Sequence, residues 1–195
     1  MINNLVLFVD AGFLSKLSKY FGGETHLRFD YFKFFYSLAE KKGLNLKKVF
    51  YYTAPPFLSN NPCEEDIFRK RGYDKFISKL KKKDFIEVRE GRVQRLINSK
   101  NEIEFHQKGV DTLMTLDLAF VRDRFENIEV MLITSDTDFC PVINELVQRG
   151  IKVNLLTYNE RKKRSDFLLS HHLVKSCSSV EYLKKEDLEE FTFLK

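Results

Sequence analysis

Short apolar runs alternate with segments of helical periodicity along this chain, and that alternation limits the fold more than any other feature. The runs Leu5–Val9, Val130–Thr134 and Val153–Thr157 are largely apolar on both faces. Such runs are typical of parallel strands that are covered on both sides, and intervening helices provide the crossovers between them. We therefore expect an α/β, doubly wound fold, with a mainly parallel sheet and helices on both of its faces.

The remaining elements follow the same two periodicities. Further strands are predicted at Val49–Thr53 and Val180–Leu183. Helices are predicted at Ala11–Tyr20, from Tyr31 to the stop at Gly43, at Cys63–Lys83, Gly109–Arg124, Phe139–Arg149 and Ser165–Lys175. Because no repeat or interdomain linker interrupts this order, we predict a single domain over residues 1–195.

One segment departs from the alternation. Phe85–Val88 and Val93–Ile97 flank Glu90-Gly91, which predicts a small β-hairpin insertion that Ile103–Phe105 extends. Sequence leaves the oligomeric state open, and a homodimer formed through this hairpin is a hypothesis.

The chain is basic, with a net charge of +5, which favours polyanionic partners such as nucleic acid. The charge gathers in one segment that includes Arg69, Lys70 and Arg71, and in a second at 161–164. A lysine-rich helix is more often a solvated face than a binding surface. The binding interpretation gains weight if both segments flank the same site.

The compartment is inferred from the cysteines and from the apolar runs. Cys63, Cys140 and Cys177 are odd in number and have no zinc or redox spacing, which is typical of a reducing cytosol. No run approaches the roughly 18 apolar residues that cross a membrane, and Leu5–Val9 is expected to be a buried strand rather than a signal peptide. We expect a cytoplasmic protein with no membrane association.

Carboxylates follow the predicted strands at the edge where parallel sheets bind ligands. Asp10 directly follows Leu5–Val9, Asp136 and Asp138 follow Val130–Thr134, and Asp111 begins the helix after Lys108-Gly109. Carboxylates packed together repel one another, and a divalent cation removes that cost. Mg²⁺ and Mn²⁺ prefer such oxygen ligands, so the pattern predicts a metal centre.

A plainer interpretation exists for each of these aspartates, because an Asp after a strand commonly caps the next helix. Asp111 and Asp138 are the two to which it applies best. Asp117 lies about 120° around the helix from Asp111, so it is expected to support the site from behind or to be exposed, and not to bind metal.

The motifs resemble those of the NYN domain family, in particular its LabA-like (DUF88) branch within the PIN-like nuclease group. The matching pieces are Leu7–Leu14, Tyr51–Pro56, Lys108–Asp111, Ile133–Phe139, Pro141, Leu146 and Arg149–Val153. The resemblance implies a Rossmann-like PIN/NYN fold, a Mg²⁺- or Mn²⁺-dependent site at Asp10, Asp111, Asp136 and Asp138, and action on RNA. Phe13 and Leu14 depart from the family, in which many members carry an Asn shortly after the first Asp.

The leading hypothesis is a metal-dependent endoribonuclease that uses these aspartates to activate water for hydrolysis of RNA. Lys108, Ser135, Arg69, Lys70 and Arg71 are candidate contacts to RNA phosphates. The alternative is a catalytically weak or inactive RNA-binding or regulatory module on the same fold. The chain lacks a Walker motif, a glycine-rich dinucleotide turn after the first strand, and the second Asp of a haloacid-dehalogenase-type phosphatase.

Four histidines and two phenylalanines are weaker candidates for functional roles. His26, His106, His171 and His172 are expected to be structural, because none forms an i, i+4 metal pair. Phe57 and Phe139 border the predicted site, where either ring could stack on a base, although core packing is the favoured role.

Overall fold

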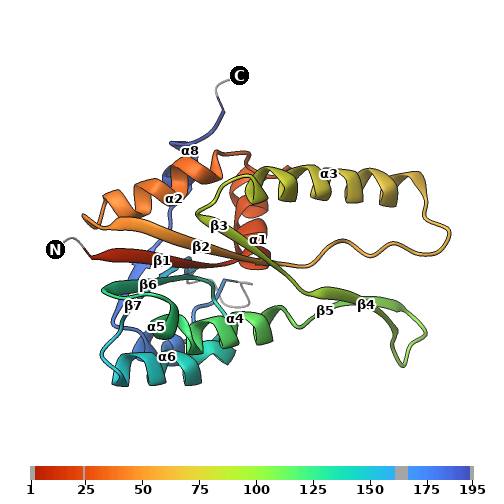
Figure 1. Cartoon of the computed structure of the whole chain (residues 1–195). Helices are drawn as coiled ribbons and strands as arrows, with labels where there is room; N and C mark the ends of the chain where they lie inside the picture. The colour runs from red at the N-terminus through yellow and green to blue at the C-terminus, as the bar shows by residue number, and fades with distance from the viewer. Residues whose placement is uncertain (1–2, 24, 161–166, 194–195) are drawn as a thin grey trace.

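The sheet is the centre of the molecule, and every strand in it runs the same way (Figure 1). A computed structural model describes residues 3–23, 25–160 and 167–193. Its main sheet has six parallel strands in the order β3-β2-β1-β6-β7-β8, which confirms the α/β fold class. The strands are β1 (Asn4–Asp10), β2 (Asn45–Thr53), β3 (Ile86–Glu90), β6 (Ile128–Ile133), β7 (Lys152–Thr157) and β8 (Ser179–Tyr182).

The strand order reverses direction between β1 and β6. From β1 the chain builds outward through β2 and β3, and it later returns to the other side of β1 to add β6, β7 and β8. Val9 pairs with Ile133 across this junction, so the carboxyl ends of β1 and β6 lie next to each other. A reversal of this kind opens a crevice beyond the strand ends, where ligands bind in open α/β sheets.

Helices cover both faces of the sheet (Figure 1). One face packs under α1, α2 and α3, and the other under α4, α6 and α7, which gives two separate buried clusters. Within the described residues, no helix is long and apolar enough to cross a membrane. The helices are α1 (Ala11–Gly22), α2 (Tyr31–Glu40), α3 (Glu64–Lys81), α4 (Val110–Ala119), α5 (Val121–Arg124), α6 (Cys140–Gln148), α7 (His171–Ser176) and α8 (Lys185–Glu189), with a 3₁₀ turn, η1 (Thr137–Phe139).

Most predicted elements are present, with their ends shifted by a few residues. The helix predicted over Gly109–Arg124 is interrupted at Phe120, which divides it into α4 and α5. The helix predicted over Ser165–Lys175 starts partly outside the described residues, and α7 begins only at His171. The helix α8 was not predicted.

A small hairpin is present, but the predicted pairing of Phe85–Val88 with Val93–Ile97 is wrong. β3 does not pair with the strand that follows it; it joins the main sheet beside β2, with Val49 opposite Ile86. Burial explains this choice, because Ile86 is buried against the core. At Gly91 the chain turns away from the sheet, and its N–H donates to the Thr53 carbonyl at 2.8 Å. A side chain at Gly91 would come within 2.6 Å of the Lys108 carbonyl oxygen.

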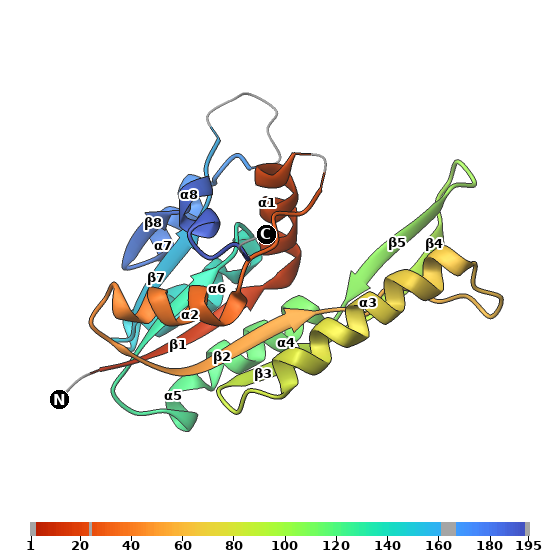
Figure 2. The same ribbon diagram turned by 90° about the horizontal axis from the view of Figure 1, so that it is seen from above.

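The real hairpin is formed by β4 (Arg92–Ile97) and β5 (Ile103–Lys108), which pair antiparallel. Asn98 forms the turn, because its side-chain oxygen accepts the N–H groups of Lys100 and Glu102. We call this hairpin the arm. Figures 1 and 2 show the arm and the N-terminal end of α3 projecting to the same side, beyond the carboxyl ends of β1 and β2.

Candidate metal centre

Asp10 stands at the junction between β1 and β6, where it ends the strand and caps α1. Its Oδ1 accepts the N–H of Phe13 at 3.1 Å, and its Oδ2 accepts the hydroxyl of Thr134 at 3.1 Å. Burial raises the pKa of Asp10 above its ordinary value, and the charge of Asp136 adds to this, while the hydrogen bonds lower it. Thr134 is fully buried, and sequence reasoning gave it no role.

Asp136 and Asp138 lie just beyond β6. Asp136 caps the turn η1, since its Oδ1 accepts the N–H of Asp138 at 2.9 Å. The N–H of Asp136 donates to Thr134 Oγ1 at 3.2 Å. Thr134 therefore connects the end of β1 to the segment after β6, and it sets the position of Asp10 relative to Asp136. Asp138 is exposed.

Asp111 reaches the same edge from a different element, the first turn of α4. Its pKa is raised first by partial burial and then by the charges of Asp136, Asp10 and Asp138. Asp111 therefore interacts electrostatically with the other three predicted aspartates. We call Asp10, Asp111, Asp136 and Asp138 the acidic edge.

The acidic edge has no counter-charge from the part of the chain that the structure describes. Among the residues that the structure describes, no lysine or arginine forms an ion pair with any of its four carboxylates. Its donors are all carboxylate oxygens, which suit Mg²⁺ or Mn²⁺. As placed, no three described His, Cys, Asp or Glu side chains form a group that could hold a metal ion together. Mg²⁺ usually takes one or two carboxylates directly and completes its shell with water, and this donor set fits such binding.

Asp117, on the same helix as Asp111, has a different environment. It is not exposed, as sequence reasoning allowed, but buried with 1% of its side chain accessible. Arg89 of β3 and Arg124 of α5 donate to its two oxygens at 2.8 and 2.9 Å, and the Tyr52 hydroxyl donates at 2.9 Å. These contacts fix α4 to β2 and β3. The sequence contains a sign of this burial, because helical periodicity places Asp117 on the same face as the buried residues Val110, Met114, Leu118 and Val121.

The predicted phosphate contacts are dispersed over the surface. Lys108 ends the arm just before Asp111, and Ser135 lies between Thr134 and Asp136. Arg69 and Lys70 form ion pairs within α3 to Asp66 and Asp74, and Arg71 is exposed. The second basic segment, 161–164, lies outside the described residues.

The aromatic and histidine candidates resolve mostly into structural roles. Phe139 is buried, as core packing predicted, and Phe57 packs on Phe105 of the arm with ring centroids 5.3 Å apart. Phe13 is 5% exposed and meets Phe167 edge-on at 6.5 Å, so it belongs to the core. The histidines are exposed; His106 contacts Glu104, and His171 and His172 begin α7.

A family model describes this whole arrangement. The NYN domain model matches residues 4–182, which include all six strands of the main sheet and the four aspartates. The chain belongs to the NYN domain family. NYN domains are PIN-like nuclease domains, and the six-stranded parallel sheet flanked by helices is consistent with that fold. No curated protein sequence matched the chain, and no solved structure did either.

Proposed function

We propose that this NYN domain protein is a Mg²⁺- or Mn²⁺-dependent endoribonuclease whose centre is the acidic edge. The observation that carries the proposal is the gathering of carboxylates at one edge of the sheet, where Thr134 hydrogen-bonds both to the Asp10 carboxylate and to the N–H of Asp136. Burial and neighbouring carboxylates raise the pKa values of Asp10 and Asp111, and no described cation is paired to any of the four aspartates. Such an arrangement is electrostatically costly unless a cation from solution joins it. Membership of a PIN-like nuclease family makes phosphodiester hydrolysis the chemistry to test first.

Asp10, Asp111, Asp136 and Asp138 are the residues that would hold the ion. When bound, it would lower the pKa of a water molecule and polarise a phosphoryl oxygen. Hydrogen bonds from the chain orient these carboxylates. Thr134 and the N–H of Phe13 donate to the two oxygens of Asp10, and the N–H of Asp138 donates to Asp136. Lys108 and Ser135 are proposed to contact the phosphates on either side of the reacting one.

The wider assignment is part of the same proposal. We infer that RNA is the partner, that the NYN domain extends over residues 1–195 as one domain, and that the chain belongs to the LabA-like branch and works in the cytoplasm. The net charge of +5 supports a polyanionic partner. A homodimer through the arm remains a hypothesis.

Cleavage of labelled RNAs of varied sequence, with Mn²⁺, Mg²⁺ or a chelator, tests the proposal. We expect cleavage only with a divalent ion. Asp136→Asn should lower the cleavage rate at least 100-fold, because it removes a proposed metal ligand. The variant should remain folded, because the Asn amide oxygen can still cap η1. Asp123→Asn, an exposed change on α5, is the matched control and should keep full activity. Metal-independent cleavage, or equal activity in both variants, would contradict the proposal.

A non-catalytic RNA-binding module is the second candidate, and the burial of Phe13 favours it. This side chain points into the core beside Phe167, so the position adds no polar group to the acidic edge. Salt-sensitive RNA binding that survives Asp10→Asn, with no cleavage under any metal condition, would support this candidate over the enzyme.

A further inference from the structure

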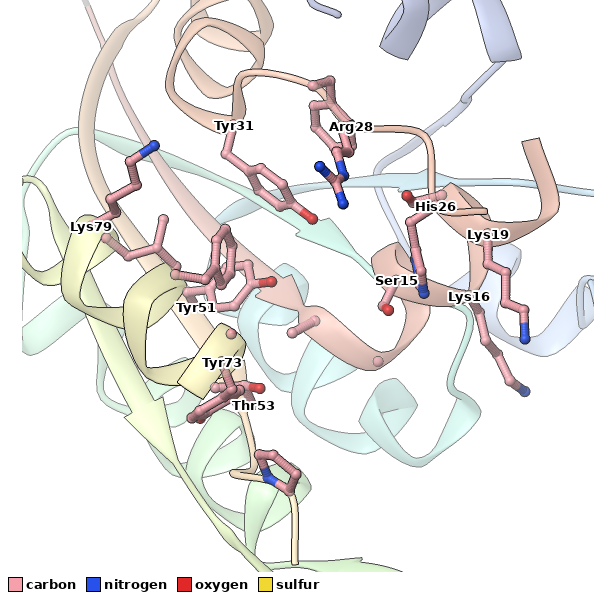
Figure 3. A pocket seen from close by; sticks show the side chains of 18 of the residues that line it. Ser15, Lys16, Lys19, His26, Arg28, Tyr31, Tyr51, Thr53, Tyr73 and Lys79 are labelled. Atoms are coloured by element: carbon pink, nitrogen blue, oxygen red, sulfur yellow. The ribbon is translucent and has the colours of Figure 1, made fainter. Parts of the chain in front are cut away.

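A groove of about 1070 Å³ opens directly beside the acidic edge. It lies between α1 on one side and α3 on the other, with the end of β2 as its floor (Figure 3). Ala11 and Gly12, which follow Asp10, form part of its wall, and an added Cβ at Gly12 would lie 3.1 Å from Asp10 Oδ1. The groove therefore begins next to the Asp10 carboxylate, although Asp10 itself does not line it. At its other end it reaches Val93 and Gln107 of the arm.

Cations surround the groove on both sides. Lys16 and Lys19 lie on α1, Arg28 on the loop before α2, and Lys79 on α3 (Figure 3). All four are exposed, and none pairs with a carboxylate in the part of the chain that the structure describes. Asp30 also lines the groove, but its Oδ1 is occupied by the N–H groups of Phe32 and Lys33. The rim is thus positive, although the neighbouring edge is negative.

The wall on the β2 and α3 side is aromatic. Tyr31, Tyr51 and Tyr73 stand on this side, across the groove from Ser15 and His26 (Figure 3). The rings of Tyr31 and Tyr51 meet edge-on with centroids 6.2 Å apart, and they pack with Phe76 at 5.1 and 5.9 Å. Phe68, near the start of α3, also lines the groove, but its side chain is 80% exposed and free to take a partner.

We propose that this groove, which we call the base groove, binds an unpaired nucleotide of a single-stranded RNA next to the cleaved position. The cationic rim takes the phosphates, and Phe68 stacks on the base. The inference rests on the proposed function for its substrate, but the groove residues are separate from the acidic edge. An exposed ring such as Phe68 can stack only on a base that is unpaired and turned out of a helix. The cations of the rim offset the repulsion between the RNA phosphates and the four carboxylates nearby.

Volume and composition support this occupant over others. The groove is at the upper limit of about 300–1,000 Å³ for small-molecule sites, so it has room for more than one nucleotide unit. Double-stranded RNA presents its bases stacked and paired, which leaves nothing for Phe68 to meet. A free nucleotide offers the same base and phosphate chemistry as a strand, and binding measurements must separate these two sources.

The test is fluorescence anisotropy with the full chain, a labelled 12-nucleotide single-stranded RNA and a chelator, so that no cleavage occurs. Lys16→Gln combined with Arg28→Gln should weaken binding about 10-fold and lower the salt dependence by about 1.4 in log–log slope, for two lost phosphate contacts. Phe68→Ala should weaken binding about fivefold or more and leave the slope unchanged, since it removes stacking only. The three side chains are exposed, so these variants should remain folded.

The matched control is Lys47→Gln combined with Lys175→Gln, which removes two exposed charges away from the groove. It should bind as the unchanged protein does. Equal loss in the groove variant and in this control would overturn the base groove, because the charge effect would then be non-specific. A duplex of the same sequence bound as tightly as the single strand, or AMP bound as tightly as the oligonucleotide, would also contradict it.

Failure here can be distinguished from failure of the proposed function. If Mn²⁺-dependent cleavage occurs but the groove variants bind and cleave normally, the enzyme stands and the base groove is wrong. If no cleavage occurs but the groove variants lose single-strand binding selectively, the base groove stands and the enzyme assignment is wrong.

Discussion

Asp111 and Asp117 lie six residues apart on α4, and their surroundings are opposite. Asp117 is buried, and two arginines and a tyrosine hydroxyl satisfy its oxygens. Asp111 lies largely at the surface and has no ion pair within the described residues. Its partial burial and three neighbouring carboxylates raise its pKa. The charge of Asp117 is thus neutralised by the protein, whereas the charge of Asp111 is repelled by neighbouring carboxylates.

The comparison separates negative charge that the protein neutralises with its own arginines from negative charge that it does not neutralise. Buried charge requires a partner, and at Asp117 the chain supplies Arg89 and Arg124 from two other elements. At the acidic edge the chain supplies none among its described residues, although it has 33 lysines and arginines. We infer that the counter-charge there comes from solution as a divalent cation, while the Asp117 network keeps α4, and so Asp111, in place.

The largest expected effect is on the neutralised aspartate. Asp117→Asn leaves Arg124 without its counter-charge and leaves Arg89 with only Glu87, at 3.5 Å. It should lower the free energy of unfolding by about 3 kcal/mol in urea denaturation. The value is at the low end for a broken buried pair because the arginine side chains are 31% and 42% exposed. Asp123→Asn should change it by no more than about 0.5 kcal/mol. Similar stability in the two variants would mean that the network does not hold α4.

A smaller effect is expected from the hydroxyl in the same network. Tyr52→Phe keeps the ring but removes one hydrogen bond to Asp117, which should reduce the free energy of unfolding by about 1–2 kcal/mol. Combined with Asp117→Asn, the loss should be less than the sum of the two, because both changes affect one network. Strict additivity in this double-mutant cycle would contradict the coupling.

The smallest change is expected at Asp111, with the opposite sign. Asp111→Asn removes one of four repelling charges, so the metal-free protein should gain about 0.5 kcal/mol, a small value because water screens this exposed side chain. Thermal unfolding in chelator measures it, with Asp84→Asn as an exposed control that should leave the melting temperature unchanged. A loss of stability would show that Asp111 is a structural cap and not a repelled ligand.

The fold could be read from the sequence because its signal is local. Continuous apolar runs specify β1, β6 and β7, and the helices between them require parallel pairing. The proximity of Asp10 and Asp136 could be predicted for the same reason, because the carboxyl ends of parallel strands meet at one edge of the sheet. The hairpin was wrong because Gly91 resembles a turn, whereas the long-range burial of Ile86 decides the pairing of β3.

The rest of the site depends on contacts between distant residues. Thr134 serves two aspartates, one of them 124 residues away, and nothing in its neighbourhood indicates this. Asp117 was visible in principle, because it shares a helix face with Met114 and Val121. Leu116 and Phe120 lie on a different apolar face of this segment, but both are about half exposed. The base groove combines α1, β2, α3 and the arm, so only the three-dimensional arrangement reveals it.

Isothermal titration calorimetry of the full chain with Mn²⁺ tests the central claim most directly. The account predicts binding to the unchanged protein, loss of binding in Asp136→Asn, and unchanged binding in Asp123→Asn. Saturation at 100 times the dissociation constant should also stabilise the unchanged protein by about 2.7 kcal/mol and leave the Asp136→Asn variant unaffected. Absence of binding, or equal Mn²⁺ binding in all three proteins, would contradict the claim that the acidic edge is a metal centre.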